Sequence, residues 1–151
     1  MPELQSNFLF TIRISVDDLC DIGATPFGTR HIDMLGKGGF DGPKLRGVVM
    51  GGMDQKIFRS DGAMNPNVRL VLKTDDEALI YMSYTGIRHG SKEVMERIAS
   101  GEEVNPSEYY LRNTPYFETS APQYDWINRI VSVGVGRRMP DHAAYDIFEI
   151  L

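Results

Sequence analysis

The sequence predicts an all-β protein: a small antiparallel β-barrel, closed or nearly closed, with one short helix. Apolar and polar residues alternate with period two along most of the chain, which is the pattern of strands with one buried face. Turn-forming residues divide this pattern into about nine or ten short strands. A barrel is favoured because closure removes exposed strand edges, and a two-sheet sandwich is the alternative. We expect one domain over residues 1–151, since no repeat or linker divides the chain.

The strands are predicted from apolar alternation and from the turns between them. One face of the first strand carries apolar residues at alternate positions: Phe8, Phe10, Ile12, Ile14 and Val16. A loop over residues 21–28 and a strand over residues 29–35 follow. Glycines at positions 36, 38, 39 and 42 are expected to supply positive-φ turns before a hairpin of residues 45–50 and 55–59, broken at Gly51-Gly52.

The second half of the sequence predicts a further hairpin, the helix and the remaining strands. Residues 67–74 and 78–84 flank the acidic tip Asp75-Asp76-Glu77. In the next segment Ser91 can cap a helix that ends near Gly101. Later strands are expected at residues 109–113, 116–119, 126–135 and 144–150.

Composition excludes several classes of function. A net charge of -5 with no run of basic residues beyond Arg137-Arg138 argues against a nucleic-acid partner. No apolar run approaches the roughly 18–20 residues that span a bilayer, so no membrane role is predicted. The lone Cys20 forms no internal disulfide, and the N-terminal residues lack the pattern of a signal peptide, so we expect a cytoplasmic protein. The three histidines lack metal-ligand spacing, and no metal site is predicted.

Asp54 is the first candidate catalytic residue. It directly follows a flexible glycine corner, from which its carboxylate can point into a cavity and act as a general base. The competing interpretation is a turn or β-bulge aspartate that accepts hydrogen bonds from nearby backbone amides.

A second cluster lies where a strand ends before the helix, at residues 84–90. Here Tyr84 is a candidate binding residue, Arg88 can hold a carboxylate, and His89 titrates near neutral pH. The alternative is an exposed loop that only caps the helix.

Tyr110 and Arg112 form a third cluster. They share a strand face by parity, so that a phenol and a guanidinium stand side by side and can bind an oxyanion. A structural salt bridge of Arg112 with an acidic residue is the alternative.

Residues 126–136 suggest a cavity floor. One face carries Trp126, Asn128, Ile130, Ser132, Gly134 and Gly136, and alternate glycines leave space above such a face. If this face points into the barrel, Trp126 and Asn128 are candidate binding residues, whereas the alternative is that it faces solvent or a closely packed neighbour.

The chain also resembles a known family. The segments that carry the resemblance are DIGATPFGTR (21–30), GGFDGPKLRGVVMGGMDQ (38–55), YTGIRHG (84–90), NPSEYYLRNTPYFET (105–119) and VGVGRR (133–138). They are similar to the uncharacterised family known as domain of unknown function 3237, or UPF 0311, and the resemblance covers nearly the whole chain. It implies a small β-barrel without an assigned activity or known catalytic residues. One departure is Gln55, where the family commonly has an aromatic residue, and we expect it to alter a pocket wall.

Two functions fit these residues. The first is a cofactor-free enzyme of isomerase, lyase or hydrolase type that acts on a small carbonyl or carboxylate compound. In this enzyme Asp54 is the general base, and Arg112 or Arg88 binds the acid group of the substrate. Tyr110 or Tyr84 stabilises the oxyanion. The second is a non-catalytic barrel that binds a small molecule. We also expect a homodimer, because small barrels commonly bury an edge or an apolar outer face against a second copy.

Overall fold

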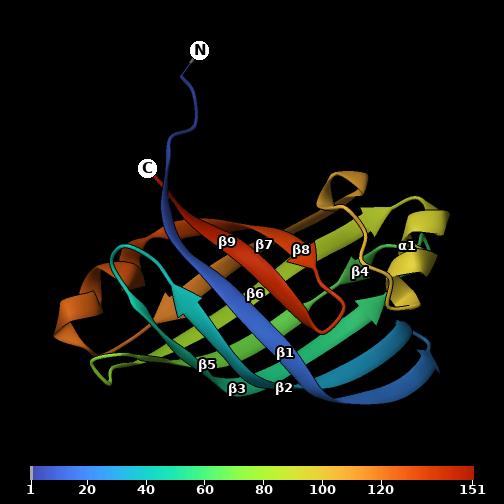
Figure 1. Cartoon of the computed structure of the whole chain (residues 1–151), viewed down its shortest axis with the longest axis horizontal. Coiled ribbons are helices and arrows are strands. Elements are labelled where there is room, and N and C mark those ends of the chain that lie inside the picture. The colour runs from blue at the N-terminus through green and yellow to red at the C-terminus, as the bar shows by residue number, and fades with distance from the viewer. Residues whose placement is uncertain (1) are drawn as a thin grey trace.

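A computed structural model describes residues 2–151 of the protein, and it is a closed antiparallel β-barrel. Eight strands form the ring: β1 (Ser6–Thr25), β2 (Gly28–Asp41), β3 (Arg46–Phe58), β5 (Asn67–Thr74), β6 (Leu79–Gly90), β7 (Tyr109–Glu118), β8 (Val131–Arg138) and β9 (His142–Ile150). Each strand pairs with the next along the chain, and β9 pairs with β1 to close the ring (Figure 1). The predicted closed barrel is therefore confirmed.

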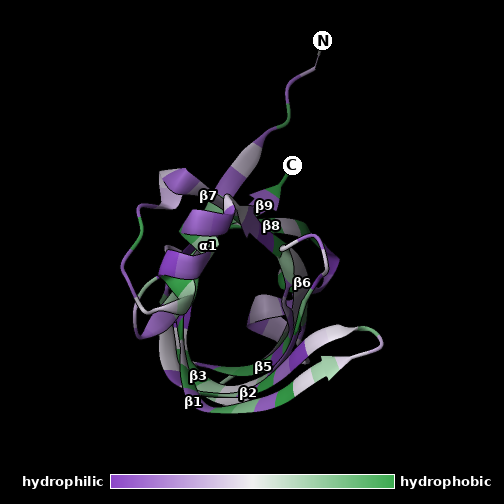
Figure 2. Ribbon diagram, turned by 90° about the vertical axis from the view of Figure 1, so that its right-hand side faces the viewer, coloured by the Kyte–Doolittle hydropathy of each residue, from purple (hydrophilic) through white to green (hydrophobic). Residues whose placement is uncertain are grey.

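One short strand and three helical segments decorate the ring. The strand β4 (Met64–Asn65) bridges the ends of β3 and β6. Helix α1 (Lys92–Ala99) follows β6, and the short 3-10 helices η1 (Pro106–Glu108) and η2 (Pro122–Arg129) precede and follow β7. In Figure 2, which looks along the barrel, α1 lies at the near end. Among residues 2–151, no helix is long and apolar enough to cross a bilayer.

Helix α1 forms where its cap predicts. The Ser91 hydroxyl accepts a hydrogen bond from the Val94 backbone N–H at 3.2 Å, which satisfies one of the free N–H groups of the first turn. Val94 and Ile98 are buried one turn apart, so one face of the helix packs on the barrel.

The strands are longer and fewer than the alternation predicts. The expected loop over residues 21–28 is mostly strand, because β1 continues through bulges to Thr25 before a turn at Pro26-Phe27. The expected break at Gly51-Gly52 is a bulge inside β3, where Gly51 has a φ of 139°. The two strands expected between residues 109 and 119 are one strand, β7.

Most of the glycines in β2 and directly after it serve close packing rather than turns. Gly36, Gly38, Gly39 and Gly42 do not have the positive φ that their spacing suggested. A side chain at Gly38 would place its Cβ 1.9 Å from the carbonyl oxygen of Arg13 on β1. The glycine therefore lets β1 and β2 approach where β1 bends across its neighbour.

The apolar core fills the end of the barrel opposite α1. Phe10 of β1 is fully buried, and its ring centroid lies 5.5 Å from that of Phe40 and 5.9 Å from that of Phe117. The 3-10 helix η2 contributes the buried Ile127 to the same core. With one end filled by aromatic and aliphatic side chains, a cavity is left only toward α1.

Candidate functional site

A small polar cavity lies inside the barrel near the end that carries α1. Its volume is about 50 Å³, and all eight long strands contribute to its walls. The lining residues are Ile14, Val16, Asp33, Leu35, Asp54, Lys56, Met64, Pro66, Val68, Tyr84, Arg88, Leu111, Arg138, Ala143 and Tyr145. Three of them are basic and two are acidic, so the cavity is electropositive when all five are ionised.

Asp54 lies in this cavity, on β3. Its side chain is buried, and one carboxylate oxygen accepts a hydrogen bond from the Asn67 backbone N–H at 3.0 Å. Burial raises the pKa of Asp54 above its ordinary value, although the Asn67 N–H and the charge of Lys56 act in the opposite direction. The bond to Asn67 is the kind that the structural interpretation of Asp54 predicts, yet it engages only one of the two oxygens.

A buried ion pair stands beside Asp54. Asp33 is the direct partner of Asp54 across the β2–β3 ladder, and its side chain is 1% exposed. The Lys56 ammonium lies 2.6 Å from Asp33 Oδ2 as an ion pair without hydrogen-bond geometry, and Asp33 Oδ1 has no hydrogen-bond partner among the described residues. Lys56 thus offsets the charge of Asp33, while the charge of Asp33 contributes to the raised pKa of Asp54.

Two arginines enter the same cavity with unused donors. Arg88 Nε and Arg138 Nη1 are buried, and neither has a hydrogen-bond partner within residues 2–151. Burial lowers the pKa of Arg88, and the neighbouring Arg138 charge lowers it further. Two guanidinium groups that repel each other and leave buried N–H groups unsatisfied are suited to hold an anion between them.

Two tyrosines complete the polar wall. The ring centroids of Tyr84 on β6 and Tyr145 on β9 lie 5.4 Å apart, and both side chains are buried. Burial raises the pKa of each phenol, and the Asp54 charge acts in the same direction. Both phenols therefore stay protonated at neutral pH. They also hydrogen-bond to each other, so that one of the two O–H groups is used within the pair.

The cavity contains three of the eight candidate residues from the sequence, namely Asp54, Tyr84 and Arg88. Tyr110, Arg112 and His89 lie together on the outside of the barrel. The Arg112 guanidinium carbon lies 4.7 Å from the Tyr110 ring centroid, and the His89 ring lies 5.2 Å from it. Tyr110 and Arg112 do share a face of β7, as parity predicts. This is the outer face, because the alternate residues Leu111 and Asn113 are buried inside the barrel.

Trp126 and Asn128 also lie outside the cavity. The expected strand over residues 126–135 begins only at Val131, and the preceding residues form η2. The Lys44 ammonium lies 5.0 Å from the Trp126 ring centroid, while the Asn128 amide is hydrogen-bonded to the backbone of Thr119. Both residues contribute to the connection between β7 and β8.

The glycine face of β8 does point into the barrel, but other side chains fill the space above it. A Cβ at Gly134 would lie 1.8 Å from Asn113 Oδ1, and one at Gly136 would lie 2.6 Å from side-chain atoms of Leu111 and Tyr145. This face is therefore packed rather than open over both glycines. Gln55, expected to alter a pocket wall, is exposed on the outer face of β3 and lies outside the cavity.

Sequence reasoning missed Asp33, Lys56, Arg138 and Tyr145. A usable signal existed for Arg138, because it continues the inward parity of Ser132, Gly134 and Gly136 by one step. The same parity links Lys56 to Asp54 on β3. Asp33 lies between Ile32 and Met34 on β2, and Tyr145 lies between Ala144 and Asp146 on β9. No local pattern marks either of them as a cavity residue.

The fold and the site together define a small antiparallel barrel with a polar, arginine-lined cavity at one end. Residues 4–150 match the family model described as "Protein of unknown function (DUF3237)", and the chain belongs to this family. The UPF0311 protein RPA1785 of Rhodopseudomonas palustris is 31% identical, and the alignment covers 99% of each chain. The UPF0311 protein CA_C3321 of Clostridium acetobutylicum is 34% identical, with 99% of this chain and 96% of the relative covered.

Solved structures share the architecture. The crystal structure of RPA1785 superposes with a TM-score of 0.96 over 100% of both chains, at 31% identity. A β-barrel-like protein of Acinetobacter baumannii superposes with a TM-score of 0.86 at 34% identity, covering 100% of this chain and 98% of that one. An enzyme from Penicillium herquei is similar with a TM-score of 0.75 at 17% identity, covering 100% and 98% of the two chains, and this likeness concerns the fold alone.

Proposed function

We propose that the protein is a cofactor-free enzyme that moves a proton on a small anionic carbonyl compound held in the barrel. The observation that carries this proposal is the position of Asp54, a buried carboxyl with a raised pKa that shares one cavity with the unused donors of Arg88 and Arg138. A raised pKa brings a carboxyl group closer to neutrality, where general acid–base catalysis is most effective.

Five cavity residues have a role in this reaction. Arg88 and Arg138 hold the anionic group of the substrate, and their buried N–H groups gain partners when it binds. The Asp54 carboxylate takes a proton from the carbon next to the carbonyl, and the electron pair of that C–H bond moves onto the carbonyl oxygen as an enolate. The hydrogen-bonded pair Tyr84–Tyr145 donates its free O–H to this oxygen, and Asp54 then returns the proton to a different atom of the substrate.

The fixed position of Asp54 supports the same chemistry. Asp54 is anchored by Asn67, and the Lys56–Asp33 pair stands beside it, so the carboxyl needs little rearrangement when charge develops. That a barrel of this fold is compatible with catalysis is illustrated by the fungal enzyme that shares it. The reaction class is thus an isomerisation through an enolate, and the substrate class is a carbonyl compound that carries an acid group.

The test uses 2-oxobutyrate in deuterated buffer as the probe and follows loss of its C3 proton signal by NMR. The wild-type protein is expected to accelerate exchange, and Asp54→Asn to slow it by about 10²-fold or more. Isothermal titration gives the affinity in parallel: Asp54→Asn should retain binding, whereas Arg138→Gln should weaken it, since it removes one cation from the anion site.

The result separates the two candidate functions. Binding that depends on Arg138 without any Asp54-dependent exchange would show a non-catalytic binding barrel. Exchange that is unchanged in Asp54→Asn would remove Asp54 from the reaction and overturn the proposal.

A further inference from the structure

The inner cavity is too small to enclose an ordinary metabolite. Its volume of about 50 Å³ compares with roughly 300–1,000 Å³ for typical ligand pockets. A carboxylate and the few atoms next to it fit between the arginines, whereas the rest of any larger ligand must lie outside. The structure therefore has to provide a second space next to the first if the ligand is larger than a three- or four-carbon acid.

Such a space exists directly beside the cavity. A pocket of about 470 Å³ lies between the end of β3, the strand β4, the end of β6 and helix α1. Arg88 and Met64 line both the inner cavity and this outer pocket, so these two side chains form the boundary between them. Met64 has an unbranched side chain with three rotatable bonds, which adapts easily to a ligand that passes it.

The outer pocket has the lining of a site for an uncharged, apolar group. Its apolar walls come from Phe58, Met64, Met95 and Ala99. Its two acidic residues, Asp61 and Glu96, equal in number its two basic residues, Lys92 and Arg88. No excess charge attracts a second anion, while methionine and phenylalanine side chains favour contact with an aromatic ring.

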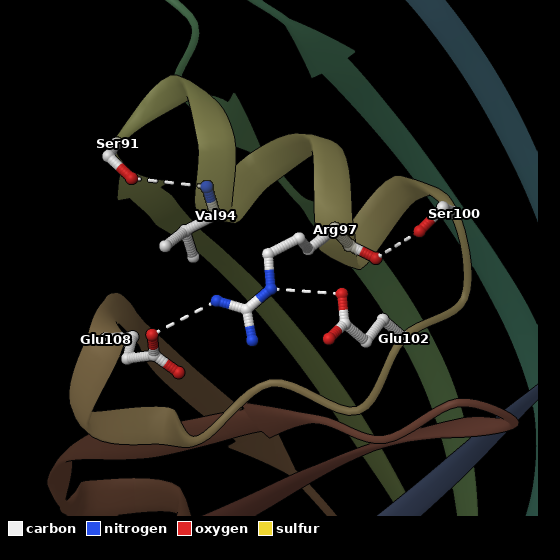
Figure 3. A network of polar contacts seen from close by, with 6 residues as sticks. All are labelled: Ser91, Val94, Arg97, Ser100, Glu102 and Glu108. Carbon is white, nitrogen blue, oxygen red and sulfur yellow. Dashed lines mark hydrogen bonds and ion pairs between the residues drawn. The ribbon is translucent and has the colours of Figure 1, made fainter.

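Contacts of Arg97 fix the position of helix α1, which forms one wall of the outer pocket. Figure 3 shows Arg97 with its guanidinium between Glu102 and Glu108, at 3.0 Å and 3.1 Å. These contacts tie the helix to the segment before β7, and the Ser91 cap fixes its first turn. Met95 and Ala99, one turn apart, are thus presented to the pocket by a helix anchored at both ends.

We infer that the ligand is a two-part molecule, with an anionic carbonyl head between Arg88 and Arg138 and an aromatic body in the outer pocket against Phe58, Met64, Met95 and Ala99. This inference rests on the proposed function for the head group and adds the class of substrate: aryl-substituted oxo acids rather than short aliphatic ones. Arg88, at the boundary, contacts the head, and Met64 packs against the link between head and body.

Two probes with the same head test the inference: 2-oxobutyrate and phenylpyruvate, each titrated calorimetrically into the protein. Phenylpyruvate should bind about tenfold tighter or more, because its ring buries apolar surface in the outer pocket. Ala99→Trp fills that pocket and should abolish the difference between the two probes. Glu93→Trp is the matched control, since it adds the same side chain to an exposed position of α1 that does not line the pocket, and it should preserve the difference.

The outcomes distinguish this inference from the function on which it rests. Equal affinity of the wild-type protein for both probes, together with Asp54-dependent exchange of 2-oxobutyrate, would overturn the two-part ligand and leave the proposed function standing. The same conclusion would follow if Ala99→Trp and Glu93→Trp had equal effects. Absence of binding of both probes would overturn both proposals.

Discussion

Folding places the carboxyl group of Asp54 in an unfavourable environment. Asp54 is buried beside the second carboxyl of Asp33, and both burial and that neighbouring charge favour its protonated form. The hydrogen bond from Asn67 and the charges of Lys56 and Arg88 only partly oppose this. A carboxyl with a raised pKa in the folded state costs stability when it is ionised, and such residues cluster at functional sites.

This cost can be measured through its pH dependence. Because the pKa of Asp54 is raised in the folded state, the folded protein binds this proton more tightly than the unfolded chain does. The free energy of unfolding therefore falls as pH rises from the ordinary value of 3.8 through the raised pKa, and stays lower above it.

Asp54→Asn removes the charge and retains an oxygen that accepts from the Asn67 N–H. We expect it to raise the melting temperature at pH 7, by roughly 2–4 °C for each 1 kcal/mol gained, and to have little effect near pH 3. Thermal scans by circular dichroism at both pH values check this. A lower melting temperature of Asp54→Asn at pH 7 would instead support a structural aspartate whose carboxylate the fold requires.

Individual strands show which parts of the site sequence patterns can predict. Period-two alternation predicts correctly that Tyr110 and Arg112 share a face of β7, and that Ser132 and Gly134 share one of β8. Parity alone does not say which face is inside. On β7 the inner face is decided by the tight packing of Asn113 against Gly134, a contact between residues on different strands.

The same limit explains the errors in element boundaries. Trp126 and Asn128 fit the alternation of β8, but Pro122 starts a 3-10 helix that includes them. Glycines that suggested turns in β2 and β3 are instead places of close strand approach or bulges, since neighbouring strands, not the local sequence, decide their role.

The packing of β7 against β8 yields a prediction at this scale. Gly134→Ala should destabilise the barrel by about 1–3 kcal/mol, because its Cβ would overlap the Asn113 side chain. The additional change Asn113→Ala removes the overlapping amide, so the double variant should lose less than the sum of the two single changes. Urea unfolding of all three variants measures this coupling.

Gly39→Ala provides the control for this experiment. It adds the same methyl group to a strand glycine whose nearest neighbour would lie at 3.4 Å, an ordinary contact, and should be close to neutral. Strictly additive losses for Gly134 and Asn113 would contradict the packing described here.

For the whole molecule, closure of the ring was predictable and the position of the site was not. Many short strands in a small chain were sufficient to favour a barrel, and the ring of eight strands confirms it. The cavity, however, collects its residues from every strand of the ring, so that Asp33 and Tyr145 become site residues only through the complete fold. Sequence patterns within one segment therefore predict Asp54, Tyr84 and Arg88 as site residues, but not the other polar residues of the cavity.

Ring closure also changes the basis for the expected homodimer. A closed barrel has no free edge among its eight long strands, so a second copy has to bind an outer face. Val71 and Tyr81 are direct cross-strand partners on the outside of β5 and β6, and both are exposed, as is the neighbouring Leu79. An apolar outer patch of this kind is suited to an interface between identical chains.

We expect the wild-type protein to be a dimer in light scattering, and the double variant Val71→Lys/Tyr81→Lys to be a folded monomer with an unchanged circular dichroism spectrum. Phe27→Lys is the control, because it alters an exposed apolar residue at the tip of the β1–β2 hairpin, away from this patch. A monomeric wild-type protein would contradict the expectation, as would a double variant that remains a dimer.

The pairing of β9 with β1 has a consequence for kinetics. All other neighbouring strands in the ring are successive along the chain, whereas this pairing joins the two ends of the chain. Within it, the side chains of Thr11 and Asp146 are hydrogen-bonded across 135 positions. Closing so long a loop has the largest entropic cost of any contact in the barrel, so this seam is expected to form late in folding. Because β9 also supplies Tyr145 to the cavity, we expect a ligand that binds there to hold the seam shut and so to lengthen the lifetime of the folded state.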